Sequence, residues 1–344
     1  MIVHFQPYVL RFLLAGALNY AKGGAKDCIK FLIRRKVARR DDSVFFRLYL
    51  LHITGIKPLG LTCKGLHGEG AGSQALTRIG ALHFANIFGL TYIHTPFAEI
   101  AHADRPMQEW AAAWEEHFGF GIGEGMAQSY SCNIVDYAIN YGHLNSTLMR
   151  YRLYKSPEFE TILGKVRNKY YCHGSPRKND LLTVSIHVRR GDVSDSKNSY
   201  MWTSNSWIAR IAVQLKAILD SKSIPYRLHI FSQGDISEFT ELQDLGGIFF
   251  LDSDPIWTMQ ELIEADILIM AKSAFSYVAG LISDGIKLGE PYEHHPQLSH
   301  WITIGPKGEC DWIEFERQLL EQVAGNLVVA EQCTAGSGAT AFSG

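Results

Sequence analysis

The chain has 344 residues, of which 47% are hydrophobic and 20% are charged, and its formal net charge is -2. This composition excludes an intrinsically disordered protein and leaves room for two domains of ordinary size. The near-neutral charge gives no indication of a nucleic-acid-binding protein. The six cysteines include no Cys-x-x-Cys pair, which argues against a zinc module or a disulfide framework and favours a reducing compartment.

Residues 1–45 are predicted to form a peripheral helical segment. Its basic residues cluster between Lys30 and Arg40, and its apolar run at 12–18 is too short to span a bilayer. One interpretation is that residues 1–40 lie on anionic lipid as a basic amphipathic helix pair, and the other is a plain surface helix. We therefore expect a cytoplasmic protein, with peripheral membrane contact as the alternative, rather than a protein of the secretory-pathway lumen.

An N-terminal α/β domain is predicted over residues 46–178. The apolar run at 45–55 indicates a strand or another buried element. Residues 100–150 are helical and aromatic, and they form either a lid on the substrate side or a helical layer. Turn formers and charges at 174–180 mark the boundary to the next domain.

A glycine-rich loop precedes the first clear helix of this domain. The helical pattern begins at Ser73, the expected N-cap, and ends at Phe88, with Gly89 as the residue that closes it. A strand is expected at 90–94. A glycine loop before a helix N-terminus is either an anion or sugar site or a plain loop. The residues assigned to that site are Gly68, Gly70, Gly72 and Gln74.

A second α/β domain is predicted over residues 179–325, because strands and helices alternate regularly from residue 181. This alternation indicates a parallel Rossmann-like sheet. The tail at 326–344 is predicted to be disordered. The strands are predicted at 181–188, 225–232, 248–251 and 266–271, and the helices at 205–219 with Asn205 as N-cap, 238–242, 258–264 and 273–281.

Polar residues follow three of these strands. Arg189 and Arg190 follow the first strand, Asp252 and Asp254 the third, and Ser273 the fourth. Ligands of open α/β sheets bind outside the carboxyl ends of the strands. We therefore expect the three strand ends to converge on one ligand site.

The residues after the first and fourth strands favour a phosphate, with a structural alternative for each. Paired guanidinium groups match phosphate oxygens and Gly191 permits a sharp turn, but ion pairs with Asp192 are the alternative. Ser273 is predicted to cap a helix whose free N–H groups and dipole attract a phosphate. The hydroxyls of Ser273 and Ser276 add hydrogen bonds, and Phe275 packs either on a base or sugar or in the core.

Three motifs make the chain resemble the fucosyltransferase superfamily that covers α-1,2-, α-1,6- and protein O-fucosyltransferases. His-Val-Arg-Arg-Gly-Asp at 187–192 resembles its first signature, and an apolar strand followed by Ser-Ala-Phe-Ser at 264–276 resembles a later one. The Gly-Glu-Gly-Ala-Gly-Ser-Gln loop at 68–74 is similar to the N-terminal glycine loop of the family. The match covers residues 65–95 and 181–290, in the order of the family.

The resemblance implies a GT-B fold, in which two Rossmann-like domains face a cleft. It implies an inverting transfer of fucose from a GDP-sugar co-substrate to a glycan or glycoprotein hydroxyl, without a cofactor or metal. By this resemblance Arg189 supports the leaving group, and Glu69 is either the catalytic base or a solvated loop acid. The residues that it assigns to the donor are His187, Arg190, Asp192, Ser273, Phe275 and Ser276.

The sequence departs from the family pattern at the position that reads guanine. Relatives carry an aspartate shortly before the strand that corresponds to 266–271, where this chain has Trp257 and Thr258. Glu261, Asp252 or Asp254 is then the acid available to contact the base of the donor. The alternative to an enzyme is a non-catalytic nucleotide-sugar- or carbohydrate-binding protein on the same fold.

Overall fold

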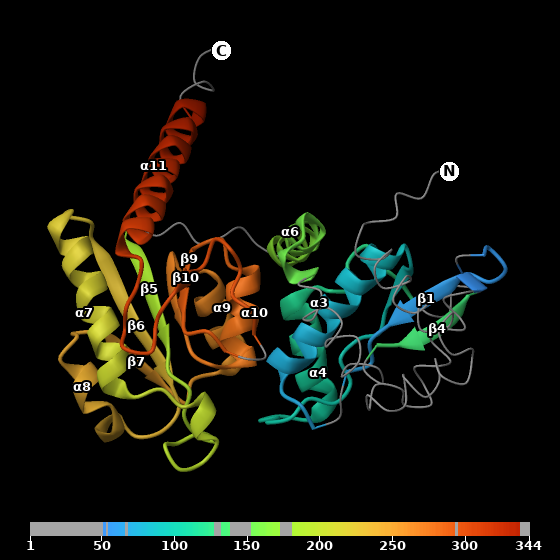
Figure 1. Cartoon of the computed structure of the whole chain (residues 1–344), viewed down its shortest axis with the longest axis horizontal. Helices are drawn as coiled ribbons and strands as arrows, with labels where there is room; N and C mark the ends of the chain where they lie inside the picture. Colours follow the sequence, from blue (N-terminus) through green and yellow to red (C-terminus); the bar gives the residue numbers. More distant parts are fainter. Residues whose placement is uncertain are drawn as a thin grey trace, which may run out of the picture. The chain divides into compact units, whose positions relative to one another are not determined.

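The computed structural model describes residues 51–52, 54–65, 68–126, 132–137, 153–172, 181–292 and 295–337. The predicted basic segment at 1–45 and the predicted linker at 174–180 lie outside the described residues. Contacts divide the chain into an N-terminal unit, Met1–Ser175, and a C-terminal unit, Pro176–Gly344. Both are drawn in Figure 1, and each is described by itself.

The N-terminal unit is built on a small parallel sheet with the strand order β3-β2-β1-β4. Helix α3 connects β1 to β2, as in the α/β unit that the sequence predicts. The described elements are β1 (Leu59–Thr62), α3 (Ala71–Phe88), β2 (Thr91–His94), α4 (Met107–Phe118), β3 (Gly125–Met126), β4 (Asn133–Asp136), the short 3-10 turn η2 (Leu153–Lys155) and α6 (Pro157–Tyr171).

Helix α3 differs from the prediction at its start and agrees with it at its end. The N-cap is Gly70, without a side-chain hydrogen bond, so the assignment of this role to Ser73 is wrong. Ser73 lies inside the first turn, where its carbonyl accepts a hydrogen bond from Thr77 Oγ1 at 2.9 Å. Gly89 ends the helix in the left-handed conformation with a φ of 63°, which a glycine adopts without steric cost.

Strand β1 was not predicted from the sequence. The apolar run at 45–55, for which a strand was one expectation, forms no strand in its described residues. Residues 51–52 are helical, and the buried strand follows only at Leu59–Thr62. Gly60 lies inside this strand, where an added Cβ would clash with Ile93 Cδ1 on β2. A glycine that makes room for a neighbouring strand weakens the apolar pattern from which strands are predicted.

The C-terminal unit contains a parallel sheet of six strands with the order β10-β9-β8-β5-β6-β7. Figure 1 shows α7 and α8 on one face of this sheet and α9 and α10 on the other. The described elements are β5 (Leu182–His187), η3 (Ser199–Met201), α7 (Asn205–Ser221), β6 (Tyr226–Ser232), η4 (Ile236–Phe239), α8 (Thr240–Gln243), β7 (Ile248–Leu251), α9 (Pro255–Ile263), β8 (Ile267–Met270), α10 (Ala274–Ile282), β9 (Ile286–Gly289), β10 (Ile302–Thr303) and α11 (Trp312–Ser337).

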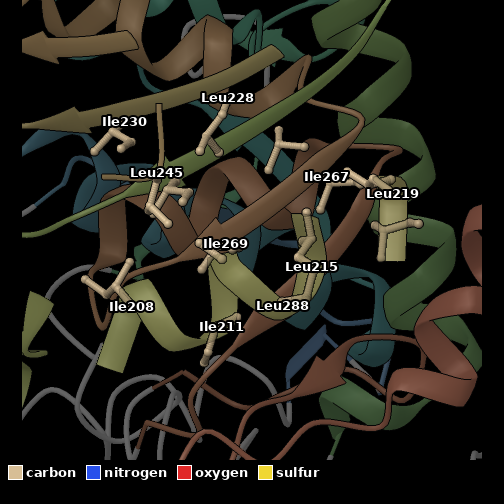
Figure 2. Close-up of a cluster of buried hydrophobic side chains, with 14 of the residues drawn as sticks. Ile208, Ile211, Leu215, Leu219, Leu228, Ile230, Leu245, Ile267, Ile269 and Leu288 are labelled. Carbon is tan, nitrogen blue, oxygen red and sulfur yellow. The ribbon is translucent and has the colours of Figure 1, made fainter. Parts of the chain in front are cut away.

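The hydrophobic core of this unit lies between the sheet and α7 (Figure 2). Successive side chains of a strand point to opposite faces, so Ile267 and Ile269 of β8 enter the same cluster. Ile211 and Leu215, four residues apart on α7, pack against them and are at most 1% exposed. This packing fixes β5, β6 and β8 side by side, which in turn fixes the positions of the loops at their carboxyl ends.

The ends of three elements differ from the prediction. Helix α7 is capped by Ser204, whose Oγ accepts from Trp207 N, and Asn205 is its first residue rather than its cap. Helix α9 begins earlier than predicted, because Asp254 caps it and a proline follows at the first helical position. Helix α11 continues to Ser337 through much of the predicted disordered tail. Within the described residues, no helix combines the length and the hydropathy that crossing a bilayer requires.

Candidate functional site

The order of the strands locates the candidate site in the C-terminal unit. The chain starts at β5 in the middle of the sheet, continues outward through β6 and β7, and then crosses back to β8, β9 and β10 on the other side. This is the order of the classical doubly wound dinucleotide-binding sheet, and its crevice opens where the order reverses. In this unit that point is the carboxyl edge of β5 and β8, which pair directly. The motifs at 187–192 and 273–276 follow these two neighbouring strands.

His187 is the last residue of β5 and faces Phe275 of α10, with their ring centroids 5.6 Å apart. Burial, together with the smaller effect of the neighbouring charge of Arg189, lowers the pKa of His187 to about 3. The imidazole is therefore neutral at physiological pH. Its Nδ1 atom is buried and has no hydrogen-bond partner among the described residues. Such a group in a native protein indicates a missing partner such as a ligand or water.

Arg189 forms an ion pair with Asp192, which is the alternative to phosphate binding that the sequence allows. Nη2 lies 2.9 Å from Asp192 Oδ2 and Nε lies 3.3 Å from Oδ1. The two side chains are 23% and 49% exposed, so this pair is accessible to solvent and contributes little to stability. Nη1 makes no hydrogen bond with any described residue, so the guanidinium retains donors for an anion.

Arg190 is directed away from Arg189, so the two guanidinium groups do not form the predicted pair. The residue is 8% exposed, and its guanidinium carbon lies over the rings of Trp202 and Phe239, at 5.4 and 5.7 Å from their centroids. Nη2 donates to the carbonyl of Thr203 at 3.1 Å and also to Asn205 Oδ1. These contacts tie the loop after β5 to the start of α7, which is a structural role.

The loop between β5 and α7 turns at Gly191. Its φ is 78°, in the left-handed region, and an added Cβ would lie 2.5 Å from Gln233 Oε1. The predicted need for glycine at this turn is therefore explained by the backbone conformation.

Helix α10 begins directly after β8 with the predicted cap. Ser273 Oγ accepts from Phe275 N at 3.2 Å, which confirms Ser273 as the N-cap. Ser276 is fully buried, and its hydroxyl donates to the carbonyl of Ala271 at 3.0 Å. Both hydroxyls thus hold the turn between β8 and α10. The N–H groups of the first helical turn and the positive end of the helix dipole are the features suited to an anion.

Asp252 and Asp254 do not lie with the other strand ends. They follow β7, the edge strand, which is two strands from β5, or about 10 Å at the usual spacing of strands. Asp254 Oδ1 accepts from Trp257 N at 2.8 Å, and Asp252 Oδ2 accepts from Gly234 N at 3.2 Å. The expected convergence of three strand ends is therefore limited to β5 and β8. Glu261, the third acid considered for the base, is 9% exposed on α9.

Glu69 lies in the predicted glycine loop of the N-terminal unit. Its carbonyl accepts from Gln74 Nε2 at 3.1 Å and from Ala101 N at 3.0 Å, so Gln74 holds the loop from inside α3. Burial raises the pKa of the Glu69 carboxyl, and its carboxylate makes no hydrogen bond with a described residue. Gly68 has a φ of 80°, which the loop requires. Gly70 is the cap of α3, and Gly72 is buried in its first turn.

Two features near these loops were not predicted from the sequence. Lys272, between β8 and α10, forms an ion pair with Glu290 after β9. Arg78 is fully buried on α3, where its guanidinium carbon lies 3.7 Å from the centroid of the Phe97 ring. The signal for Lys272 was its place directly before the Ser-Ala-Phe-Ser motif. Arg78 gave no signal, because it falls on an apolar helix face.

A separate hollow of about 730 Å³ lies along α4 in the N-terminal unit. Its wall includes Glu115, whose Oε1 is 2.7 Å from His94 Nε2 and whose Oε2 accepts from Phe97 N at 3.1 Å. Both carboxylate oxygens are therefore engaged by the protein, and the other lining residues are mostly small and apolar, such as Ala111 and Gly119. This geometry indicates a carboxylate that fastens α4 to the loop after β2.

Comparison with known proteins gives only remote similarities. No family model matches the chain, and no curated protein matches it. Eighteen chains of solved structures match. One is a crystal structure of POFUT1 in complex with GDP, with a TM-score of 0.34 and 12% identity over 67% of this chain and 95% of that one. Another is E. coli heptosyltransferase WaaC with ADP-2-deoxy-2-fluoro heptose, with a TM-score of 0.35 and 11% identity over 73% of this chain and 94% of that one. The predicted α/β class is confirmed, and the two parallel sheets show it directly.

Proposed function

We propose that the chain is a glycosyltransferase that takes its sugar from a nucleoside-diphosphate sugar. The observation that carries the proposal is the meeting of two motifs that lie far apart in the sequence. Residues 187–192 and 273–276 follow neighbouring parallel strands, β5 and β8, at the point where the strand order reverses. An open α/β sheet binds nucleotides at this point. The same two motifs carry the resemblance to the fucosyltransferase superfamily.

In this proposal the diphosphate of the donor lies between Arg189 and the N-terminus of α10. Negative charge grows on the diphosphate as its bond to the sugar breaks, and Arg189 stabilises that charge. The N–H groups at the start of α10 add donors of fixed orientation. The neutral His187 offers its unpartnered Nδ1 to the donor as a hydrogen-bonding group.

The second reactant is a hydroxyl of a glycan or glycoprotein acceptor, and the proposed base is Glu69. The carboxylate takes the hydroxyl proton while the oxygen attacks the anomeric carbon from the face opposite the diphosphate, which inverts that carbon. Burial raises the pKa of Glu69, which makes its carboxylate a stronger base. Fucose as the sugar, guanosine as the nucleoside and the absence of a metal are parts of the same proposal, and all three come from the family resemblance.

The test is turnover of nucleotide sugars by the wild type and by Arg189→Ala. Because removal of one group that stabilises developing charge costs about 100- to 1,000-fold in rate, we expect a loss of that size in kcat. Arg210→Ala on α7 is the matched control, since its guanidinium binds the carbonyl of Lys307 at 2.7 Å on an exposed surface. Donor binding by the wild type without turnover on any acceptor would instead support the non-catalytic binding protein.

A further inference from the structure

The carboxyl edge of the C-terminal sheet contains a second cation that the proposed mechanism does not use. Lys272 follows β8 and immediately precedes the cap of α10, and Glu290 follows the neighbouring strand β9. Lys272 Nζ lies 3.2 Å from Glu290 Oε2, and the two side chains are 14% and 23% exposed. The ion pair therefore lies on the same edge as His187 and Arg189 and is more buried than the pair of Arg189 with Asp192.

The Lys272–Glu290 pair is incompletely satisfied within the protein. An ammonium group has three N–H donors, and Glu290 is its one polar contact among the described residues. Gln297 Nε2 donates to the carbonyl of Glu290 at 3.3 Å, while its Oε1 is buried without a partner among those residues. With Nδ1 of His187, two buried polar atoms near this edge lack partners. Each of these two atoms can take a partner that the described residues do not supply, and a polar ligand at this edge is one such partner.

A diphosphate carries more than one negative charge, so a second cation beside Arg189 would strengthen its binding. Arg190, the expected second cation, is enclosed by Trp202 and Phe239 and bound to two backbone carbonyls. Lys272 is a cation at the carboxyl edge of β8, as Arg189 is at the carboxyl edge of β5. It can therefore supply the second charge that Arg190 does not. Lysine also suits this role as a compact charge that binds phosphate from any direction.

We propose that Lys272 is the second diphosphate-binding cation and that the carboxylate of Glu290 competes with the diphosphate for Lys272. This inference rests on the proposed function, because it takes a nucleoside diphosphate as the ligand. In the free protein Glu290 neutralises Lys272. When the diphosphate binds, its oxygens replace the carboxylate on the ammonium, and the cost of separating the ion pair weakens the binding. Glu290 thereby lowers the affinity for the donor and for the nucleoside diphosphate that remains after transfer.

The experiment is calorimetric titration of the full chain with GDP, UDP and ADP, and then with inorganic pyrophosphate. With the diphosphate that binds most tightly, we expect Lys272→Met to raise Kd by at least about tenfold, or about 1.4 kcal/mol. Glu290→Gln keeps the shape but removes the competing charge, so we expect it to lower Kd severalfold. Lys272→Arg retains the charge and is expected to recover most of the affinity. The Kd for pyrophosphate is expected to rank the variants in the same order, because Lys272 contacts the phosphates of the ligand.

The matched controls are Lys222→Met and Glu316→Gln. These two residues form an ion pair at 2.7 Å with exposures of 26% and 41%, at the end of α7 and therefore at the opposite edge of the sheet. They change the net charge by the same amount, so an unchanged Kd in both separates a local contact from a general effect of charge.

The outcomes separate the inference from the proposed function. Equal affinity of Lys272→Met and the wild type would overturn the role of Lys272 while the donor site stood. Weaker binding by Glu290→Gln would overturn the competing role of Glu290, because Glu290 would then contact the ligand itself. Failure of the wild type to bind any of the three nucleoside diphosphates would overturn the proposed function together with this inference. If Lys272→Met does not fold, Lys272→Gln is titrated in its place, with the same criteria.

Discussion

The neutral His187 at the end of β5 makes the stability of the protein depend on pH. The folded state binds its proton only near pH 3, whereas an unfolded histidine binds one near pH 6.5. The unfolded state therefore gains protons first as the pH falls, and the free energy of unfolding decreases below pH 6.5. His187 contributes at most about 1.4 kcal/mol to this decrease for each pH unit.

We predict that His187→Gln flattens this dependence. Urea unfolding at about pH 7 and about pH 5 should show a smaller loss of the free energy of unfolding in the variant than in the wild type. An unchanged slope in His187→Gln would show that the ring accepts a proton more readily than its burial implies.

Individual side chains of the site were predicted with unequal success, and the reason is physical. Ser273 was recognised as a cap because capping is a local interaction between neighbours in the sequence. Arg190 was not recognised as a structural residue, because its partners Trp202 and Phe239 are brought to it only by the folding of a loop and a second helix. Asp254 has a polar role at a strand end, but its partner is the backbone of α9 rather than a ligand.

At the scale of elements, the loop between β5 and α7 depends on Arg190 for its conformation. Burial lowers the pKa of Arg190, and the nearby Glu238 and Glu241 act in the opposite direction and favour its charge. The side chain bonds the carbonyls of Arg189 and Thr203 at 2.8 and 3.1 Å, respectively. Each buried hydrogen bond to a charged group contributes about 1.5–3 kcal/mol.

We predict that Arg190→Ala lowers the free energy of unfolding by at least about 2 kcal/mol, because it leaves these carbonyls unpaired. Arg190→Lys should not restore it, since lysine lacks the planar fork. Arg189→Ala should cost less than about 1 kcal/mol, because its ion pair is exposed. Urea unfolding of the three variants measures the difference. Similar losses for both alanine variants would contradict the assignment of separate roles.

Elements with a clear apolar pattern were predicted well, and elements without one were not. The strands and helices between 181 and 281 appear in the predicted order, because they alternate in apolar pattern and carry caps and turns. β3 and β10 have two residues each and offer no pattern to detect. β1 was hidden by its glycine, which the packing of β2 requires.

At the scale of the whole molecule, the strand order of the C-terminal sheet decides which predicted residues belong together. The sequence predicts four strands of this unit alternating with four helices, but it does not specify which strand lies beside which. The return of the chain from β7 to β8 across β5 places His187 and Ser273 on neighbouring strands and leaves Asp252 at the edge. Pairing between strands is a long-range contact, and no local propensity encodes it.

The most direct test of the account is a thermal-shift measurement of the full chain with GDP, UDP and ADP. A ligand at 100 times its Kd stabilises the folded state by about 2.7 kcal/mol. That corresponds to a rise in Tm of about 5–10 °C for a domain of this size. We predict this rise with GDP in the wild type and its loss in Arg189→Ala. A rise with UDP or ADP alone would contradict guanosine as the nucleoside. No rise with any of the three would contradict the central claim that the carboxyl edge of β5 and β8 binds a nucleoside diphosphate.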